Sequence, residues 1–481
     1  MDIVSLLETL TTGIFKAEED FLKDPKKFSE FEERVHALFD KGALQFIEGV
    51  LNEADTMICE SIYRKSRFDI QRHDKRTLIT TVGDAVITQT LFREKETGEC
   101  RYLLGEMMGL NPHERFSEAA EAQILREAVK TSYAEAAKVL PSQSKISKTT
   151  VMNKIHGIAE EIPLSAPGKK KECRFLFIEA DEDHIAEQHG NGSSERNGNF
   201  ISRMAYVYEG YEELCKGRHS LTGIHYEAGL YEGSKGIERF WKKVGRYIRK
   251  HYDTGMIERI YVCGDGASWI RAATEYIPES VFVIDKFHLT KYINHAAGQM
   301  LDERDLCKSE IYRMLYKGHK KEFTEYTGRM AESAADEDAV LSLRNYVLNN
   351  WKAVQTSLHE KDLHGCSAEG HVSHLLSDRM SSRPMGWSRK GADRMSKLRA
   401  YVKNYGEEKI LELVKYTRAE RQLRMTGTDA TVPAETKKLI RPFIIHDHYD
   451  QARSYIERIQ ASVPGISARK SFSIREQIRL L

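Results

Sequence analysis

Apolar residues recur three and four positions apart over the first 70 residues, and strand-like alternation follows them. SLLETLTTGIF and FEERVHALFDKGALQFIEGVLNEA both carry the helical period. We expect the helices of residues 1–70 to pack on each other or on a second copy of the chain. From Arg76, the run RTLITTV, a Gly83-Asp84 turn, AVITQTLFR, an ETGE turn and CRYLL predict a small three-stranded meander over residues 71–110.

Residues 111–168 contain the helix start and stop signals of a helix-turn-helix. Ser132 and Glu135 form a capping box, Pro141 stops that helix, and a second helix begins near Ser147. The apolar side of the second helix carries Val151, Ile155 and Ile158. An ordinary helical pair explains this pattern as well as a DNA-binding unit does. On the DNA-binding interpretation, the residues facing the major groove are Lys148, Thr149, Asn153 and Lys154.

From Arg174, strand-like and helix-like runs follow one another in an order that predicts the fold class. The strands RFLFIEAD, ISRMAYVYEG and HSLTGIHYEA precede a helix GIERFWKKVGRYIRKHY, a strand IERIYVCGD, a helix ASWIRAATEYI and a strand VFVID. This is the order of a ribonuclease H-like mixed sheet that is covered on both faces. We therefore expect an α/β protein whose catalytic core begins at residues 172–298, behind a helical and helix-turn-helix-like N-terminal region.

The residues after this core are predicted to be helical. About 65 residues, assigned to 299–365, are rich in charge and read as an α-helical insertion. The core resumes at 366–388, in a helix that Glu369 opens and Pro384 ends. The inward positions of that helix are Val372, Leu375 and Leu376. Residues 389–481 form a basic, mainly helical C-terminal region.

Charge and cysteine usage indicate the kind of partner and the cellular compartment to expect. The 73 basic and 72 acidic residues nearly cancel, but Ser388–Leu481 contains 20 Lys and Arg against 11 Asp and Glu, which suits a phosphate backbone or a solvated helical face. The 7 cysteines are scattered singly, which is typical of a reducing compartment. No apolar run approaches the ~18 residues of a membrane span. We expect a cytoplasmic protein, associated with the nucleoid if it binds DNA.

Acidic residues follow two of the predicted strands. Asp181 comes directly after CRFLFIEA, Asp265 comes directly after IERIYVCG, and Glu369 begins a later helix. In a ribonuclease H-like sheet the first and fourth strands are neighbours, so acids at these places point into one pocket. Carboxylates are the ligands that Mg²⁺ or Mn²⁺ prefers, and two such ions about 4 Å apart can serve the attacking and leaving oxygens of a phosphodiester. The sequence therefore predicts a two-metal site.

Each acid also has a structural explanation. Asp commonly caps turns, and the glycines around Asp265 suit a turn. A Glu in the first turn of a helix is favoured by the helix dipole. Asp183 is an alternative first acid, because residues 181 and 183 lie on one side of a strand and Glu182 on the other. We prefer Asp181 because it directly follows the apolar strand.

Four segments resemble a known family. IEADEDHI, YVCGDGASWI, IDKFHLTKYI and AEGHVSHLLSDRMSSRPMGWS are similar to the DDE transposases of bacterial insertion sequences, specifically the ISLre-type family long described as uncharacterised. That family is similar in layout to the Mutator and hAT-like group, whose ribonuclease H-like domain is interrupted by a helical insertion before the Glu. The similarity runs over most of the chain.

The resemblance implies roles for individual residues. Asp181, Asp265 and Glu369 would be the three catalytic, metal-binding acids, at spacings of 84 and 104 residues. Asp285 and His288, as DKFH, match the group's C/DxxH motif and would lie near the active site without binding metal. Whether Arg379, Arg383 and Trp387 contact DNA or pack stays open.

The implied activity is metal-dependent phosphoryl transfer on double-stranded DNA. Water attacks a phosphodiester at the transposon end, and the freed 3′-hydroxyl then attacks target DNA, with no covalent enzyme intermediate. The N-terminal half would bind the terminal inverted repeats, and the joining of two ends implies a homodimer or a higher oligomer on DNA. The alternatives are a structure-specific nuclease on the same fold and a DNA-binding regulator whose acids no longer bind metal.

Overall fold

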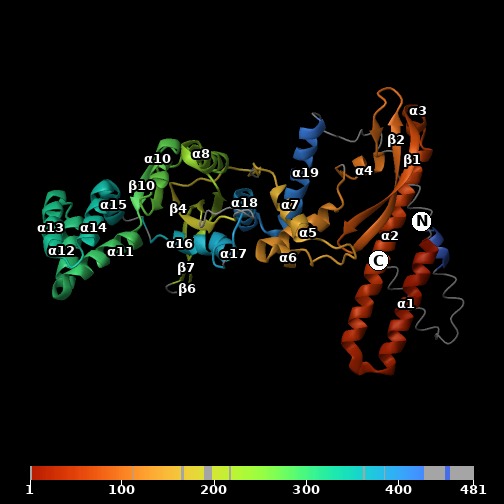
Figure 1. Ribbon diagram of the computed structural model, residues 1–481, viewed down its shortest axis with the longest axis horizontal. Coiled ribbons are helices and arrows are strands. Elements are labelled where there is room, and N and C mark those ends of the chain that lie inside the picture. Colours follow the sequence, from red (N-terminus) through yellow and green to blue (C-terminus); the bar gives the residue numbers. More distant parts are fainter. Residues whose placement is uncertain are drawn as a thin grey trace. The chain divides into compact units, whose positions relative to one another are not determined.

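The computed structural model describes residues 3–111, 113–163, 167–188, 198–215, 218–360, 363, 365–383, 385–426 and 450–455. The fold is mixed α/β, with a helical N-terminal region and a mixed sheet (Figure 1). The chain divides into two compact units. The first consists of Met1–Ala128, Ser132–Lys154 and Leu411–Leu481. The second consists of Val129–Thr131 and Ile155–Ile410.

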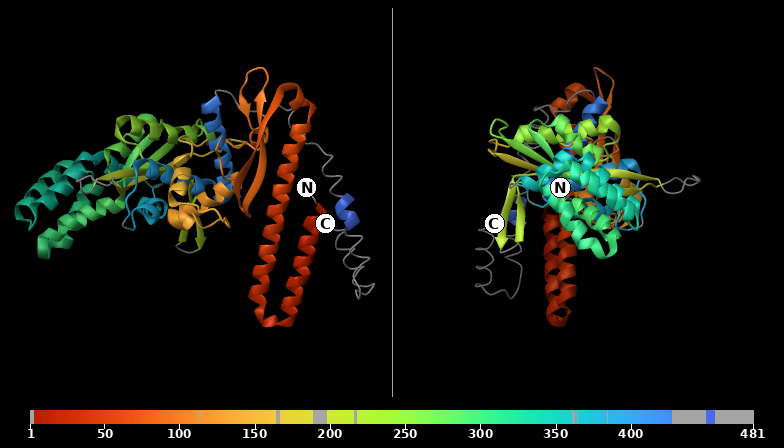
Figure 2. Two further views of the ribbon diagram at one scale, coloured as in Figure 1. Left: turned by 45° about the vertical axis from the view of Figure 1, so that its right-hand side comes forward. Right: turned by 90° about the vertical axis from the view of Figure 1, so that its left-hand side faces the viewer.

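A long helical hairpin begins the first unit. Helix α1 (Ile3–Lys23) and helix α2 (Phe28–Glu60) run antiparallel, joined by a short 3₁₀ turn (Figure 2). Gly13 allows close approach, because a Cβ there would lie 2.4 Å from Leu38 Cδ1. The prediction that these helices pack on each other is confirmed.

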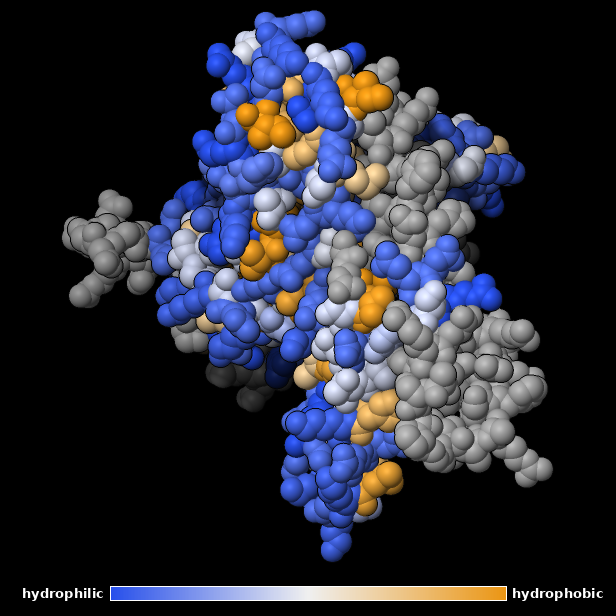
Figure 3. Space-filling model, turned by 90° about the vertical axis from the view of Figure 1, so that its right-hand side faces the viewer, coloured by the Kyte–Doolittle hydropathy of each residue, from blue (hydrophilic) through white to orange (hydrophobic). Residues whose placement is uncertain are grey.

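Large apolar side chains of the hairpin remain exposed. These are Ile14, Phe15, Leu22, Phe28, Phe39 and Phe46. Figure 3 shows apolar patches on the projecting hairpin, within a face that is mainly hydrophilic. The contact between α1 and α2 therefore leaves some of the large apolar side chains of these helices exposed.

The predicted meander follows the hairpin, although its third run, CRYLL, is a strand only at Cys100–Arg101 and begins a helix at Leu103. Strands β1 (Phe68–Thr80), β2 (Gly83–Glu94) and β3 (Cys100–Arg101) form an antiparallel sheet in the order β1-β2-β3. Two short helices flank it, α3 (Ile62–Arg67) and α4 (Leu103–Met107). Side chains of α2 cover the open edge of β2: Glu48, Asn52 and Asp55 accept the backbone N–H groups of Val86, Thr88 and Thr90 at 2.6, 2.6 and 3.0 Å. Bonding these amides protects an edge that could otherwise pair with another strand.

The helix-turn-helix-like segment forms with the predicted cap at Ser132, and Ser147, where the second helix was expected to begin, is also a cap. It contains α5 (Glu118–Lys130), α6 (Tyr133–Ala136) and α7 (Lys148–His156). Ser132 accepts the Glu135 N–H at 3.2 Å, and Ser147 accepts the Thr150 N–H at 3.1 Å. The predicted apolar side of the second helix is confirmed, since Val151, Ile155 and Ile158 are buried.

A buried group of charges joins α7 to the start of the C-terminal region within the first unit. Lys154 Nζ lies 2.5 Å from Glu114 and 3.0 Å from Glu121. Arg418, on helix α19 (Ile410–Thr426), also binds Glu121, at 2.5 Å. The paired ions are nearly inaccessible to water, and this segment of the basic C-terminal region is therefore part of the packed structure.

The second unit is built on a five-stranded sheet of order β10-β9-β4-β5-β8. The strands are β4 (Phe175–Ala186), β5 (Asn199–Tyr208), β8 (His225–Gly229), β9 (Arg259–Gly264) and β10 (Ser280–Ile284). Strands β4, β9 and β10 are parallel, and β5 and β8 are antiparallel to their neighbours.

One predicted strand is wrong. HSLTGIHYEA forms two strands, because Gly223 turns the chain at φ 64°. The first part is β7 (Arg218–Thr222), which pairs with β6 (Gly210–Cys215) as a separate two-stranded ribbon. Only the second part, β8, joins the main sheet.

Helices cover both faces of the main sheet. On one face, α8 (Gly233–His251), α9 (Ser268–Arg271) and α10 (Ala273–Tyr276) enclose a core that includes Ile178, Trp241 and Val262. On the other face lie α16 (Ala368–Val372), α17 (Asp378–Met380) and α18 (Arg389–Tyr405). Helix α18 is anchored there by a hydrogen bond between the Ser202 and Ser396 hydroxyls at 2.9 Å.

The segment predicted as a helical insertion is helical, but the run of helices begins before residue 299. It follows β10 as α11 (Lys286–Ala297), α12 (Arg304–Tyr316), α13 (Lys320–Ser333), α14 (Glu337–Asn349) and α15 (Trp351–His359), which share a core of their own (Figure 2). The helix that Glu369 opens runs from α16 through a π-helical turn (Ser373–Ser377) into α17. Its predicted inward residues Val372, Leu375 and Leu376 are buried. Pro384 lies outside the described residues.

Candidate functional site

Asp181 lies within a strand and not at its end, contrary to expectation. Strand β4 continues to Ala186, paired with β5 throughout. Its pairing with β9, however, stops at Glu179 and Cys263. Asp181 therefore occupies the first part of β4 beyond β9, where the sheet narrows. The end of a pairing, and not the end of the strand, makes room for this side chain.

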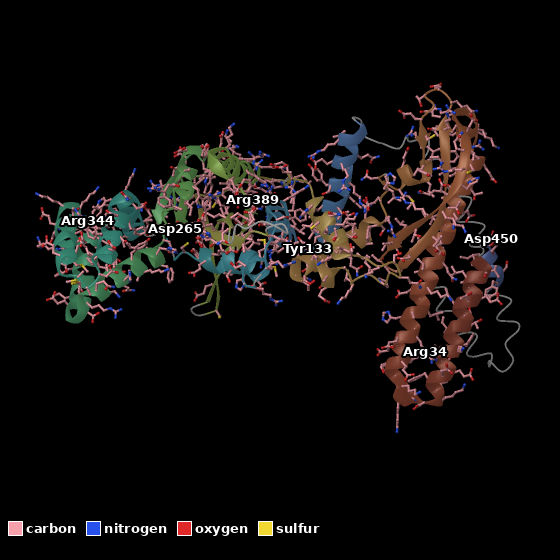
Figure 4. The ribbon with its side chains drawn as sticks, viewed as in Figure 1. Arg34, Tyr133, Asp265, Arg344, Arg389 and Asp450 are labelled. Atoms are coloured by element: carbon pink, nitrogen blue, oxygen red, sulfur yellow. The ribbon has the colours of Figure 1, made fainter. Side chains whose placement is uncertain are left out.

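Asp265 directly follows β9, as predicted. Its Oδ1 accepts the Ala267 N–H at 2.8 Å, so the turn that the glycines suggested is present. Gly264 permits close packing on β4, since a Cβ there would be 3.2 Å from the Ala180 carbonyl oxygen. Gly266 has φ +101° and borders Asn350 next to α14. Figure 4 shows Asp265 where the sheet meets the insertion helices.

The charges of Asp181 and Asp265 interact. Burial and, after it, the negative charge of Asp265 raise the pKa of Asp181 to about 6, against the lowering effects of the Glu182 N–H and of His288. The Glu182 N–H donates to Asp181 Oδ1 at 2.8 Å. A poorly hydrated carboxylate with a second negative charge nearby is an environment in which a cation would stabilise the ionised form of Asp181.

The DKFH segment and Glu369 lie in the same surroundings. Asp285 caps α11 by accepting the Phe287 N–H at 2.9 Å, and His288 Nε2 lies 3.9 Å from Asp285 Oδ2. Burial raises the pKa of Asp285, and the charges of Glu179 and Glu369 raise it further. Glu369 is exposed in the first turn of α16. The three predicted acids and the DKFH pair are thus linked by electrostatic interactions, although they come from four separated segments.

Asp183 has a different environment from Asp181. Its two carboxylate oxygens accept the Ser381 hydroxyl at 3.1 and 2.8 Å. This bond ties the end of β4 to the residues after α17. Of the two, Asp181 is the residue whose pKa is raised by the charge of Asp265.

Two of the three residues left open after α16 are packed. The Arg379 guanidinium lies 5.0 Å from the Trp387 ring centroid, and both side chains are buried. Trp387 Nε1 donates to the Met380 carbonyl at 3.1 Å. Arg383 is exposed.

The residues proposed to face DNA divide into two groups. Lys148, Thr149 and Asn153 are exposed along α7. Lys154 instead turns inward and is 11% exposed, because Glu114 and Glu121 hold its ammonium. The expectation that Lys154 projects outward is wrong. Its helical position alone did not reveal these two partners, which precede it by 40 and 33 residues.

One further ligand-like cluster was not predicted. Among the described residues, only Asp55, Cys59 and His73 offer three such atoms all within 4.8 Å of one another. The Thr90 hydroxyl joins them: it donates to Asp55, and it lies 3.2 Å from Cys59 Sγ and 2.7 Å from His73 Nδ1. The i, i+4 spacing of Asp55 and Cys59 was the visible signal. The hydrogen bonds through Thr90 already account for the arrangement.

The raised pKa of Asp181 predicts that the free energy of unfolding depends on pH. Its folded-state pKa of about 6 exceeds the ordinary 3.8, so stability falls as pH rises between these values and stays lower above them. In metal-free buffer we expect Asp181→Asn to be more stable than wild type at pH 7.5 by about 3 kcal/mol, and by much less at pH 4.5. Urea unfolding at both pH values, with Asp183→Asn as control, measures this. An equal gain at both values would contradict it.

Comparison with known proteins assigns the chain to a family. The model of the uncharacterised protein family UPF0236 matches residues 21–417, and the chain belongs to that family. A UPF0236 protein of Caldanaerobacter subterraneus subsp. tengcongensis is 36% identical over 418 residues, covering 84% of this chain and 86% of the relative. A second from the same strain is 35% identical, covering 82% of each. The name of the first joins eleven locus designations of that one strain.

A comparison of structures finds the Drosophila P element transposase strand transfer complex. The TM-score is 0.23 with 10% identity, and the match covers 69% of this chain and 92% of that chain. A superposition of this quality does not establish a shared fold. Within the described residues, none of the helices combines the length and the apolar character needed to cross a membrane.

Proposed function

We propose that this protein is the transposase of a bacterial insertion sequence, which cuts DNA at transposon ends and joins them to target DNA. The observation that supports the proposal is the placement of Asp181 on β4 and of Asp265 directly after the neighbouring parallel strand β9, where the charge of Asp265 acts on Asp181 and that of Glu369 acts on the nearby Asp285. We interpret the β10-β9-β4-β5-β8 sheet, with its helical insertion before Glu369, as a ribonuclease H-like core.

The donor set suits hard divalent cations. Asp181, Asp265 and Glu369 offer only oxygen ligands, and they are the residues that would hold Mg²⁺ or Mn²⁺. The raised pKa of Asp181 supports a cation near it, because a positive charge would relieve its interaction with Asp265. When bound, two such ions supply Lewis-acid activation of the attacking oxygen and neutralise charge at the leaving oxygen.

The chain itself contributes rigid placement. Strand β4 and the turn after β9 hold the first two acids, and α16 presents the third. Asp285 and His288 lie at the start of α11, with His288 Nε2 3.9 Å from Asp285 Oδ2. Direct attack by water and then by a 3′-hydroxyl requires no Ser, Tyr or Cys nucleophile.

The relatives give independent support. A protein that carries eleven locus designations in one strain is encoded repeatedly in a single genome, and two other relatives from that strain carry four and two designations. Repetition of nearly the same gene is what a mobile element produces. A housekeeping nuclease or a regulator offers no comparable reason for such multiplication.

The DNA partners follow from the mechanism. The exposed face of α7 would bind the terminal inverted repeats, and basic residues of the C-terminal region would hold phosphates. Most of that region, beyond Thr426, lies outside the described residues. Because two ends are joined in one event, a homodimer or a larger assembly on DNA is expected.

Incubation with DNA that carries the element's own termini tests the proposal. Wild type should cut at the ends and give a joined product with Mg²⁺ or Mn²⁺, and EDTA should abolish both. Cutting without joining would favour a structure-specific nuclease. Sequence-specific binding without any metal-dependent cutting would favour a regulator.

DNA recognition by α7 predicts two distinguishable effects. Lys148→Ala should weaken binding to all DNA and reduce the salt slope by about 1, as loss of a phosphate contact does. Asn153→Ala should cost about 1–3 kcal/mol on terminal-repeat DNA but little on random DNA, as loss of a base contact does. Fluorescence anisotropy at several salt concentrations measures both. Lys321→Ala is the control, because Lys321 is 92% exposed on α13 in the insertion. Uniform effects of all three changes would contradict the assignment.

A further inference from the structure

We propose that Glu179 is a positioning residue that ties the helix of the third acid to the strand of the first. The effect of this connection on catalysis rests on the proposed function. The connection between β4 and α16 itself does not. Glu179 is on β4, two residues before Asp181 and therefore on the same side of the strand. It is 2% exposed, and none of the sequence patterns distinguished it from the apolar strand around it.

Both oxygens of the Glu179 carboxylate accept hydrogen bonds. Oε1 accepts the Tyr208 hydroxyl at 2.7 Å. Oε2 accepts the Ser367 backbone N–H at 2.7 Å, the Cys366 thiol at 3.3 Å and the Tyr206 hydroxyl. The tyrosines come from the neighbouring strand β5, and the other two donors come from the chain just before α16. One buried side chain thus joins two strands and the start of a helix.

The bond to Ser367 acts directly on the third acid. Ser367 is the N-cap residue of α16, and Glu369 is two residues further along. The α-helical part of this segment has five residues, too few to be stable without outside contacts. An acceptor at the N-cap amide therefore fixes where the helix begins and in which direction Glu369 projects.

A second contact holds the next turn of the same segment. The His371 ring stacks on Tyr206 with 4.2 Å between centroids, and His371 Nδ1 lies 2.7 Å from the Tyr226 hydroxyl. Tyr206 thus contacts both Glu179 and His371. The segment carrying Glu369 is positioned by the polar and aromatic face of β4, β5 and β8.

The chemistry of the site requires an acceptor of this length. A carboxylate can accept from all the surrounding donors, whereas Gln would place its own N–H₂ group against one set of them. Asp would be one methylene too short to reach Ser367. Since both oxygens already accept from the protein, Glu179 is suited to hold α16 and not to bind an ion itself.

Glu179→Gln in the full chain tests the tie, with Glu227→Gln as a matched control. Glu227 is another buried Glu of the same sheet, which accepts from Tyr231 at 2.6 Å and Lys243 at 2.7 Å. The first measurement is hydrogen–deuterium exchange of the peptide containing Ser367 to Val372, without DNA or metal. We expect at least ~10-fold faster exchange in Glu179→Gln and no change in Glu227→Gln.

The second measurement is the Mg²⁺ concentration that gives half-maximal cutting of terminal-repeat DNA. Loss of a residue that orients a metal ligand typically costs about 10–100-fold in metal affinity or activity. We expect Glu179→Gln to raise the half-maximal Mg²⁺ concentration about 10-fold. Glu227→Gln should lower the Tm but leave the half-maximal Mg²⁺ concentration unchanged. A merely structural role of Glu179 would lower the Tm in the same way without changing the metal requirement.

The outcomes separate the two proposals. If wild type shows no metal-dependent cutting, the proposed function fails, but the exchange measurement still tests the tie. If wild type cuts and Glu179→Gln changes neither exchange nor metal requirement, the tie is refuted. Should Glu179→Gln fail to fold, Tyr206→Phe decides, because it removes one donor to Oε2 and keeps the aromatic ring. It should shift both readouts in the same direction, by a smaller factor than that expected of Glu179→Gln, and no shift would refute the tie.

Discussion

Asp265→Asn is expected to abolish metal-dependent cleavage while leaving the fold intact. The amide retains an oxygen that can accept the Ala267 N–H, so the turn after β9 is preserved. It loses the negative charge that a divalent cation requires. We expect a fall in cleavage rate on the order of 10³-fold or more, equivalent to about 4 kcal/mol of transition-state stabilisation. The measurement is single-turnover cleavage of DNA carrying the element's termini, with binding assayed separately.

The companion variants make this result specific. Asp181→Asn and Glu369→Gln should fall by a similar factor, and the double variants should lose little more, because the three acids act as a unit. Asp183→Asn is the control, since Asp183 binds Ser381 and can still accept from it as Asn. Normal cleavage by Asp265→Asn would contradict the three-acid site. Loss of cleavage in Asp183→Asn but not in Asp181→Asn would move the first acid by two residues.

The elements of the chain were predictable where a local pattern determines them. The first two strands of the meander, the Ser132 cap, the helix start near Ser147, the helical character of residues 299–360 and the inward face of the segment after Glu369 follow from period, turn residues and capping. These features depend on residues within a few positions of each other. Short-range physics is therefore sufficient to place them.

Features that depend on distant partners were missed. Where β4 stops pairing with β9 is set by the length of β9, so the sequence around Asp181 could not show that it lies within a strand. Lys154 is turned inward by carboxylates from another helix and loop. Glu179 looks like a stray polar residue in an apolar strand until Ser367 is brought to it across 188 residues. Alternation could have marked it, because it shares its side of β4 with Asp181.

The second large effect is expected in the first unit, at Arg418. Replacement by Met keeps much of the side-chain volume but removes the cation from Glu121, which lies 2.5 Å away, and from the backbone oxygen of Phe116, 2.9 Å away. The Glu121 carboxylate is 4% exposed, and after the replacement its negative charge would be neutralised only by Lys154, at 3.0 Å. Removing one partner of a buried ion pair typically costs about 3–5 kcal/mol.

Urea unfolding followed by far-ultraviolet circular dichroism measures this loss, and Arg424→Met is its control. Arg424 lies on the same helix, and its ion pair with Glu420 is largely exposed, so its removal should cost no more than about 0.5 kcal/mol. A large difference between two arginines six residues apart would mean that α19 is held in the first unit by its buried charges. Equal, small effects would contradict that role. In that case the residues of the basic C-terminal region up to Thr426 would be attached to the unit by apolar packing alone.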